Sequence, residues 1–287
     1  MSLQLHENAS RTLYDDSYKA AYAAMGPDLR PYVTLRSHSG LEDFYFRTMG
    51  RMVATTRGAM QQQVPTTDVD HAKVQCTLTN LIASTLTDIF SQDYTNAPQE
   101  VPALAKVHAG AIKRQETQKV IDAMNAARVA GLPTGHAIAE GGSVGLTAAK
   151  LLLIRKALKA NDISEVPTIA IGETQEYDLL AASDNKFTSA DFSAAAGATT
   201  GNIRQGHFGF NYVMIGTGRD EDGLPLIDSD DRVVFAWVPS AVGLVTALEK
   251  REVNYESDKV SWRSTAMLRC GAAVIDTLGL VSAECDE

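Results

Sequence analysis

Apolar residues recur at steps of three and four between residues 96 and 130, which predicts one long helix. Asn96 can cap its first turn, Pro98 is tolerated there, and Gly131 followed by Pro133 ends it. The recurring positions are Val101, Leu104, His108, Ile112, Val120, Ile121 and Met124. At 1.5 Å per residue this helix spans about 50 Å, whereas an average helix has about 11–12 residues. Because its apolar stripe is narrow, we expect its own chain to leave one flank uncovered.

Residues 40–90 instead have the character of β-strands. Residues 73–80 alternate between apolar and polar positions, with Val74, Cys76 and Leu78 on one face. The preceding residues 50–64 are extended in character and weakly apolar, and the turn-forming residues Pro65, Asp68 and Asp70 separate the two stretches. An isolated two-stranded hairpin is only marginally stable. We therefore expect a long hairpin that lies on another part of the structure.

Three tyrosines before Pro27 stand four residues apart: Tyr14, Tyr18 and Tyr22. This spacing predicts a short amphipathic helix. The tyrosines can pack on the chain's own core or on a neighbouring chain, and both interpretations stay open. Polar chain ends are usually ordered only where something ties them down, which favours the neighbour.

The remaining pattern mixes helices and strands. A helix is predicted at 146–160, with Leu152 and Leu153 on an apolar side and Arg155 and Lys156 on a basic side. Further helices are predicted at 173–183 and 239–249, and strands at 166–172, 206–216, 232–238 and 279–284. Residues 253–276 are predicted to form one long strand or a pair of strands. The chain contains no internal repeat. The fold class is therefore α+β, with one projecting hairpin.

Composition narrows the classes of function. The chain has 287 residues, enough for one large domain or two smaller ones, and a net charge of −9. Phosphate contacts come from Lys and Arg, so this charge argues against nucleic-acid binding as the main task. We expect neither a signal peptide nor a membrane segment, because the first residues are polar and mixed and no apolar run approaches about 18 residues.

Few sequence motifs indicate a disulfide, a metal site or a catalytic site. Cys76, Cys270 and Cys285 are widely spaced, so we expect reduced thiols without a disulfide or zinc site. The six histidines form no metal-binding motif, and His108, on the apolar stripe of the long helix, is interpreted as a packed histidine. They are His6, His38, His71, His108, His136 and His207.

Two further stretches are candidate ligand sites, and neither completes a known motif. Gly141, Gly142 and Gly145 precede a helix as in phosphate-binding loops, but the Walker lysine and a preceding strand are missing. The acidic residues of 218–231 do not follow the EF-hand pattern and are interpreted as a solvated turn; they are Asp220, Glu221, Asp222, Asp228, Asp230 and Asp231. We therefore predict no enzyme, and no catalytic, cofactor-binding or metal-binding residues.

Four segments in this order resemble the major capsid proteins of tailed bacteriophages, whose shell fold is named after phage Hong Kong 97. They are the hairpin 40–90, the long helix 96–130, residues 151–192 and residues 232–287. The third segment carries the step Ser189, Asp191 and Phe192. The fourth carries Trp237, Pro239 and Ala241, then Gly271, Ala272, Asp276, Gly279 and Leu280.

The resemblance implies an N-terminal arm at 1–39, an extended loop at 40–90, a peripheral domain at 91–130 and 240–287, and an axial domain at 131–239. It implies hexamers and pentamers in an icosahedral shell around double-stranded DNA, held without specific binding. A separate scaffolding protein, a portal and a decoration protein are the implied partners. The implied location is the virion, assembled in the host cytoplasm. A neighbour's hairpin and arm would cover the free flank of the long helix.

Two alternatives stay open. An encapsulin-like shell would use the same fold to enclose enzyme cargo in a cell. A soluble α/β nucleotide-binding enzyme would use the loop Gly141–Gly145 instead. Covalent crosslinking between subunits is not carried over, because nothing marks a partner for Lys73, the only lysine of the hairpin.

Overall fold

The computed structural model describes residues 3–24, 28–40, 42–50, 54, 71–88, 97–139, 144–181, 207–216, 222–227 and 231–287. Its helices are α1 (Leu3–Ala24), α3 (Ala97–Ala130), α4 (Ala148–Ala160) and α5 (Glu173–Ala181), with 3₁₀ turns at Arg30–Tyr32, His207–Gly209, Ser257–Lys259 and Thr277–Gly279. The strands before the long helix α3 are β1 (Thr34–Ser37), β2 (Phe44–Met49), β3 (His71–Cys76) and β4 (Thr79–Asp88). Those after it are β5 (Ala137–Ile138), β6 (Thr168–Ile171), β7 (Asn211–Met214), β8 (Asp231–Trp237), β9 (Val242–Glu256), β10 (Ser261–Val274) and β11 (Leu280–Asp286).

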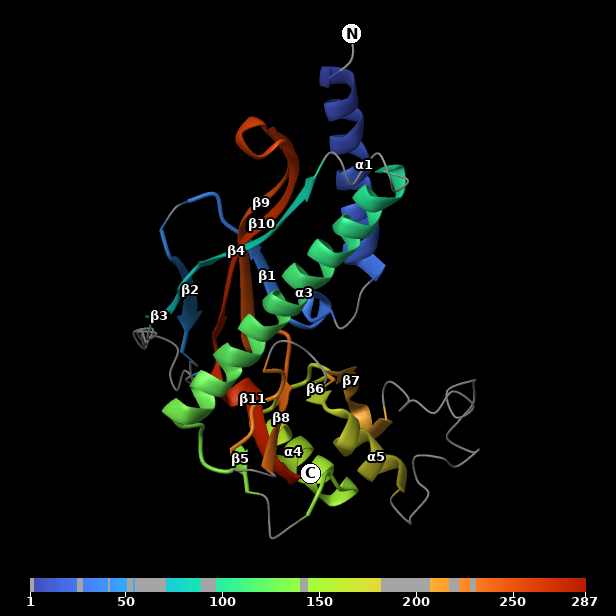
Figure 1. Cartoon of the computed structure of the whole chain (residues 1–287). Helices are drawn as coiled ribbons and strands as arrows, with labels where there is room; N and C mark the ends of the chain where they lie inside the picture. The colour runs from blue at the N-terminus through green and yellow to red at the C-terminus, as the bar shows by residue number, and fades with distance from the viewer. Residues whose placement is uncertain are drawn as a thin grey trace, which may run out of the picture.

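A four-stranded sheet with the order β1-β9-β10-β4 forms the upper part of the molecule in Figure 1. Strands β9 and β10 are antiparallel and form a long hairpin that extends well beyond the short strand β1, while β4 stays paired with β10 up to Ser261. Helices α1 and α3 pack on one face of this sheet, where Val253, Ala266 and Leu268 are buried. The α+β prediction and the long helix are confirmed, and the helix ends at Gly131, whose φ of 109° suits glycine.

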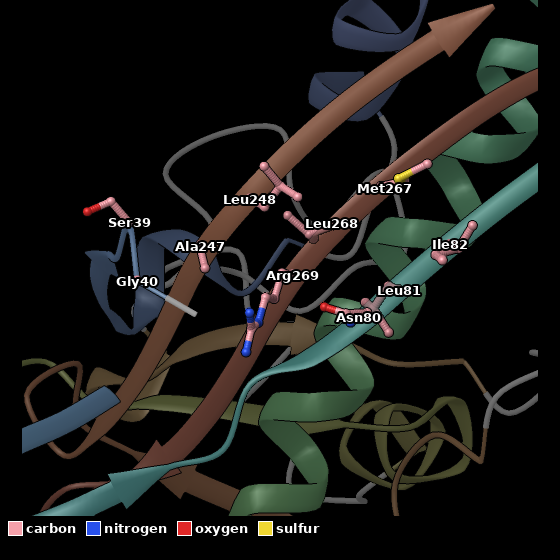
Figure 2. A pocket seen from close by; sticks show the side chains of 10 residues that line it. All are labelled: Ser39, Gly40, Asn80, Leu81, Ile82, Ala247, Leu248, Met267, Leu268 and Arg269. Carbon is pink, nitrogen blue, oxygen red and sulfur yellow. The ribbon is translucent and has the colours of Figure 1, made fainter. Parts of the chain in front are cut away.

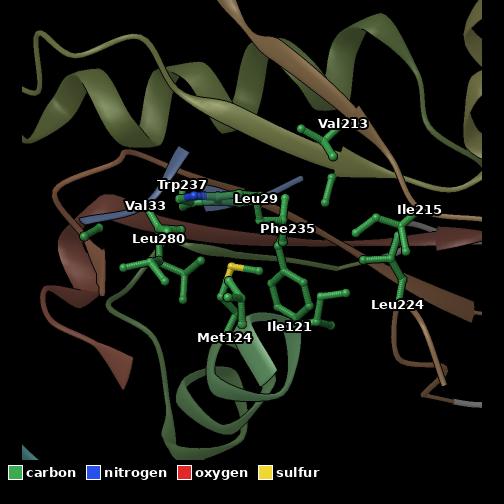
Figure 3. Close-up of a cluster of buried hydrophobic side chains, with 14 of the residues drawn as sticks. Leu29, Val33, Ile121, Met124, Val213, Ile215, Leu224, Phe235, Trp237 and Leu280 are labelled. Carbon is green, nitrogen blue, oxygen red and sulfur yellow. The ribbon is translucent and has the colours of Figure 1, made fainter. Parts of the chain in front are cut away.

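A five-stranded sheet with the order β5-β11-β8-β6-β7 forms the lower part. The second half of α3 covers one face, where Val120, Ile121 and Met124 pack against Phe235 and other buried side chains (Figure 3). Helices α4 and α5 cover the opposite face. Successive residues of β8 point in turn toward α3 and toward the layer of α4 and α5. Helices therefore cover both faces of this strand, and six of its seven residues are buried.

One predicted helix is wrong. Residues 239–249 begin with a turn and continue as strand β9, which pairs in parallel with β1. The pairing joins Leu35 to Leu244, residues far apart in the sequence. Alternating burial on a sheet, which needs that distant partner, outweighs the helical preference of the local residues.

The predicted division of α4 is also wrong in part. It ends at Ala160 as predicted but begins two residues later, at Ala148, and Thr147 caps it by accepting a hydrogen bond from the Lys150 backbone N–H. However, Leu152 is 52% and Leu153 49% exposed, so they do not form its buried side. The buried side consists of Lys150, Leu151, Ile154 and Leu158.

The hairpin is present in its basal part. Strand β2 pairs antiparallel with β3 from Phe44↔Cys76 to Met49↔His71. The first strand predicted at 50–64 lies almost entirely outside the described residues. So do Gly141, Gly142, the step Ser189–Phe192 and most of the acidic stretch 218–231.

Candidate assembly surfaces

Helix α1 packs on its own chain. Tyr14 and Tyr18 are buried against α3 and β9, so the interpretation that favoured a neighbouring chain for these tyrosines is wrong. The Tyr14 hydroxyl lies 2.5 Å from His108 Nδ1, and His108 Nε2 lies 2.8 Å from the Thr85 hydroxyl. His108 is thus packed, as predicted, and burial lowers its pKa. Both ring nitrogens join α3 to neighbouring elements.

A buried ionic cluster holds the end of α1 to the middle of α3. Glu116 accepts hydrogen bonds from the Tyr22 hydroxyl and from Arg30, whose Nε lies 2.8 Å from Oε1. Lys113 Nζ donates to the Tyr22 carbonyl at 2.7 Å and lies 3.5 Å from Asp28. Burial, followed by the Glu116 charge, raises the pKa of the Tyr22 hydroxyl far above its ordinary value. Sequence patterns missed this cluster, although Lys113 and Glu116 interrupt the apolar stripe there.

Helix α3 is covered largely by its own chain. The helix α1 and strands β4 and β10 contact its first half, and the five-stranded sheet contacts its second half. Val107 and Val129 are exposed on the side that remains free. The helix therefore leaves one flank uncovered by the described residues, as expected, and covering of this flank by a neighbour's hairpin and arm stays a prediction. Two further surfaces are available for other chains.

The base of the β2–β3 hairpin is fixed on the four-stranded sheet. The Phe46 ring lies against the backbone of Gly243, where a Cβ atom would be 2.3 Å from the ring. Cys76, Leu78 and Val245 complete this buried cluster. Only glycine leaves room for the ring at this position of β9.

The exposed face of the hairpin carries apolar side chains that the described residues do not bury. Met49 is 76% exposed, and Tyr45 is exposed on the same strand. Tyr45 and Met49 are separated by four residues, so they lie on one face of β2. Arg47 lies between them on this face and pairs across the hairpin with Lys73, so the face is a mixed apolar and basic surface available for contact.

A groove of about 330 Å³ crosses the other face of the four-stranded sheet. Leu81 and Leu268 belong to the cluster beneath α1 and α3, so the alternate residues Ile82 and Met267 face away from these helices. Figure 2 shows Leu248, Met267 and Ile82 on three neighbouring strands in front of α3. Ile82 is 63% and Leu248 53% exposed. The groove is thus a mainly apolar surface that the described residues leave uncovered.

A family model described as "Phage capsid protein" matches residues 7–287. The chain belongs to the phage capsid protein family. A search of curated proteins gives no match. The capsid protein is thus a structural component of a phage shell and is located in the virion. The encapsulin-like and enzyme alternatives are not favoured by this match.

Solved phage shells share the fold of this capsid protein. The head structure of Helicobacter pylori bacteriophage KHP40 gives a TM-score of 0.65 at 10% identity, over 92% of this chain and 93% of that chain. The mature capsid of bacteriophage PhiM1 gives 0.62 at 15% identity, over 91% and 87%. Mycobacterium phage Che8 gives 0.55 at 22% identity, over 83% and 84%. These similarities support the Hong Kong 97-like fold.

The three cysteines, Cys76, Cys270 and Cys285, are buried as free thiols. Burial raises the pKa of Cys76 to about 11 and that of Cys270 to about 12, which keeps both thiols protonated at neutral pH. Among the described residues no group of three or more His, Cys, Asp or Glu could hold a metal ion, and no helix is long and apolar enough to cross a membrane.

Proposed function

We propose that this chain is the major subunit of an icosahedral phage head, and that its copies form hexamers and pentamers around double-stranded DNA. The family match over residues 7–287 carries this proposal. The described residues support it, because they leave two surfaces with apolar side chains uncovered: the hairpin face with Tyr45 and Met49, and the groove with Ile82, Met267 and Leu248. Exposed apolar side chains that gather on a surface mark places where proteins interact.

The hairpin of one copy fits the groove of the next. When two different surfaces of the same chain meet, the contact repeats from copy to copy and closes into a ring if the rotation allows it. Burying Met49 against Ile82 and Leu248 removes apolar area from water, at about 25 cal/mol per Å². The close packing of the Phe46 ring on the Gly243 backbone fixes the direction in which the hairpin points.

The domains follow the two sheets. The peripheral domain comprises 91–130 and 240–287 with the four-stranded sheet, and the axial domain comprises 131–239 with the five-stranded sheet. Strand β11 pairs with β8 and β5, so the end of the chain also contributes to the axial sheet. Residues 40–90 form the extended loop, and its last strand, β4, pairs with β10 in the four-stranded sheet. Residues 1–39 form the N-terminal arm, whose helix α1 stays on its own α3.

The proposed partners follow from the role in the head. A separate scaffolding protein guides assembly in the host cytoplasm, a portal occupies one vertex and a decoration protein binds outside. The net charge of −9 weakens contact between the shell and packaged DNA, because like charges repel. The proposed role is structural and includes no catalytic step.

Electron microscopy of the purified chain tests the proposal. We expect shells, or rings of five and six copies, that form without a nucleotide or metal. Compact, monodisperse dimers would contradict the proposal. Strong, salt-dependent DNA binding by free subunits would contradict the proposed passive contact with DNA.

A further inference from the structure

The layer formed by α4 and α5 has oppositely charged helices. Helix α4 contains Lys150, Arg155, Lys156 and Lys159 and no acidic residue. Helix α5 contains Glu173, Glu176 and Asp178 and no basic residue. Two neighbouring helices on one face of a sheet thus differ in charge: α4 is basic and α5 is acidic.

The two helices lie together on the five-stranded sheet, below the long helix in Figure 1. The Asp178 carboxylate accepts a hydrogen bond from the Leu146 backbone N–H, 3.3 Å away, just before α4. Leu151 and Ile154 of α4, and Leu179 of α5, are buried against the sheet. The other sides of both helices therefore face outward.

Each outward side carries large apolar residues among its charges. Leu152 and Leu153 are about half exposed on α4, beside the exposed Lys156. Tyr177 is 70% exposed on α5, and the exposed Glu173 lies one helical turn before it. Interfaces between proteins combine such apolar centres with a charged rim.

We propose that α4 of one copy docks against α5 of the next copy in the ring. Leu152 and Leu153 pack on Tyr177, while Lys156 meets Glu173. The surfaces are complementary in charge, and each copy carries both of them, so the same contact can repeat from copy to copy. This inference rests on the proposed assembly function and names the side chains that make one of its contacts.

A charge swap tests this contact in assembly of the full chain. Lys156→Glu and Glu173→Lys each place like charges together, and each should lower the yield of rings and shells by at least about tenfold. The double variant restores the pairing with reversed polarity and should recover most of the yield. Leu152→Ser with Leu153→Ser should also lower the yield. Raised salt should slow wild-type assembly more than assembly of the two single charge-reversal variants.

Lys106→Glu on α3 is the matched control, because it makes the same charge change at an exposed position away from the α4–α5 layer. Thermal unfolding of every variant checks that its monomer folds. If wild-type chains form shells and Lys156→Glu assembles normally, the α4–α5 contact is overturned while the assembly function stands. The same conclusion follows if the double variant does not recover the yield. Equal losses in Lys106→Glu and Lys156→Glu would also overturn the contact. A wild-type chain that forms no ring or shell, or only dimers, would overturn the assembly function and the contact together.

Discussion

The two halves of α3 lie in contrasting surroundings. The second half presents Val120, Ile121 and Met124 to the apolar interior of the five-stranded sheet. The first half meets α1 through small residues, Ala105 and Ala109, and through hydroxyl, imidazole and charged groups. The second half of the helix is thus part of a hydrophobic core, whereas its first half binds α1 largely through polar contacts.

This difference separates global stability from local stability. Apolar burial is roughly proportional to area and does not depend on direction, so the second half stabilises the whole fold. Hydrogen bonds and ion pairs contribute modestly when formed but are costly when one partner is lost. The first half therefore determines whether α1 stays in place, and the following changes test that separation.

The largest expected effect is in the apolar half. Met124→Ala removes a fully buried side chain and should lower the free energy of unfolding by about 2–5 kcal/mol. Chemical denaturation measures it. Val129→Ala on the same helix is the control, because Val129 is exposed and its loss should stay within about 0.5 kcal/mol. Equal effects at both positions would contradict the assignment of the core.

The next effect is in the polar half. Glu116→Gln leaves Arg30 and the Tyr22 hydroxyl with a neutral acceptor, and the cost should be about 2 kcal/mol. Hydrogen exchange should speed up in α1 while the five-stranded sheet stays protected. The exposed Asp122→Asn on α3 is the control. Equal loss of protection in both halves would show that they are not separate.

A smaller effect concerns the hairpin. Gly243→Ala places a Cβ where the Phe46 ring lies and should cost about 1–3 kcal/mol. The same change should cost much less when Phe46→Ala has already removed the ring, which a double-mutant cycle measures. If Gly243→Ala destabilises the chain equally with and without the Phe46 ring, the ring does not pack against Gly243.

The smallest effect is a dependence on pH. Burial lowers the pKa of His108 in the folded chain, so the unfolded chain takes up this proton first as the pH falls. Stability contributed by neutral His108 is therefore full above its unfolded pKa of about 6.5 and is lost as the pH falls below that value. His108→Gln should make stability depend less on pH in this range. An identical pH profile for the variant would contradict this role.

Local patterns predicted the long helix and the buried strands β6 and β8, because each has a strong period or a continuous apolar run. They did not predict the first part of β9, whose partner β1 lies about two hundred residues away in the sequence. They also could not show which of the adjacent residues Leu151, Leu152 and Leu153 faces the sheet. In such a run, the tertiary contact decides which face is buried.

The site was harder to predict than the fold. The hairpin was expected from alternation, yet its groove is assembled from strands distant in sequence, β4, β9 and β10. The burial of Tyr14 and Tyr18 on α3 depends equally on a long-range contact. Family resemblance indicated the function, while the surfaces that carry it needed the three-dimensional arrangement.

A density map of assembled particles by electron cryomicroscopy tests the central claim most directly. We predict that the hairpin face of one copy, at Tyr45 and Met49, lies in the groove of a neighbour at Ile82, Met267 and Leu248. A groove that stays open to solvent in the assembled shell, or is filled by its own chain, would contradict this prediction.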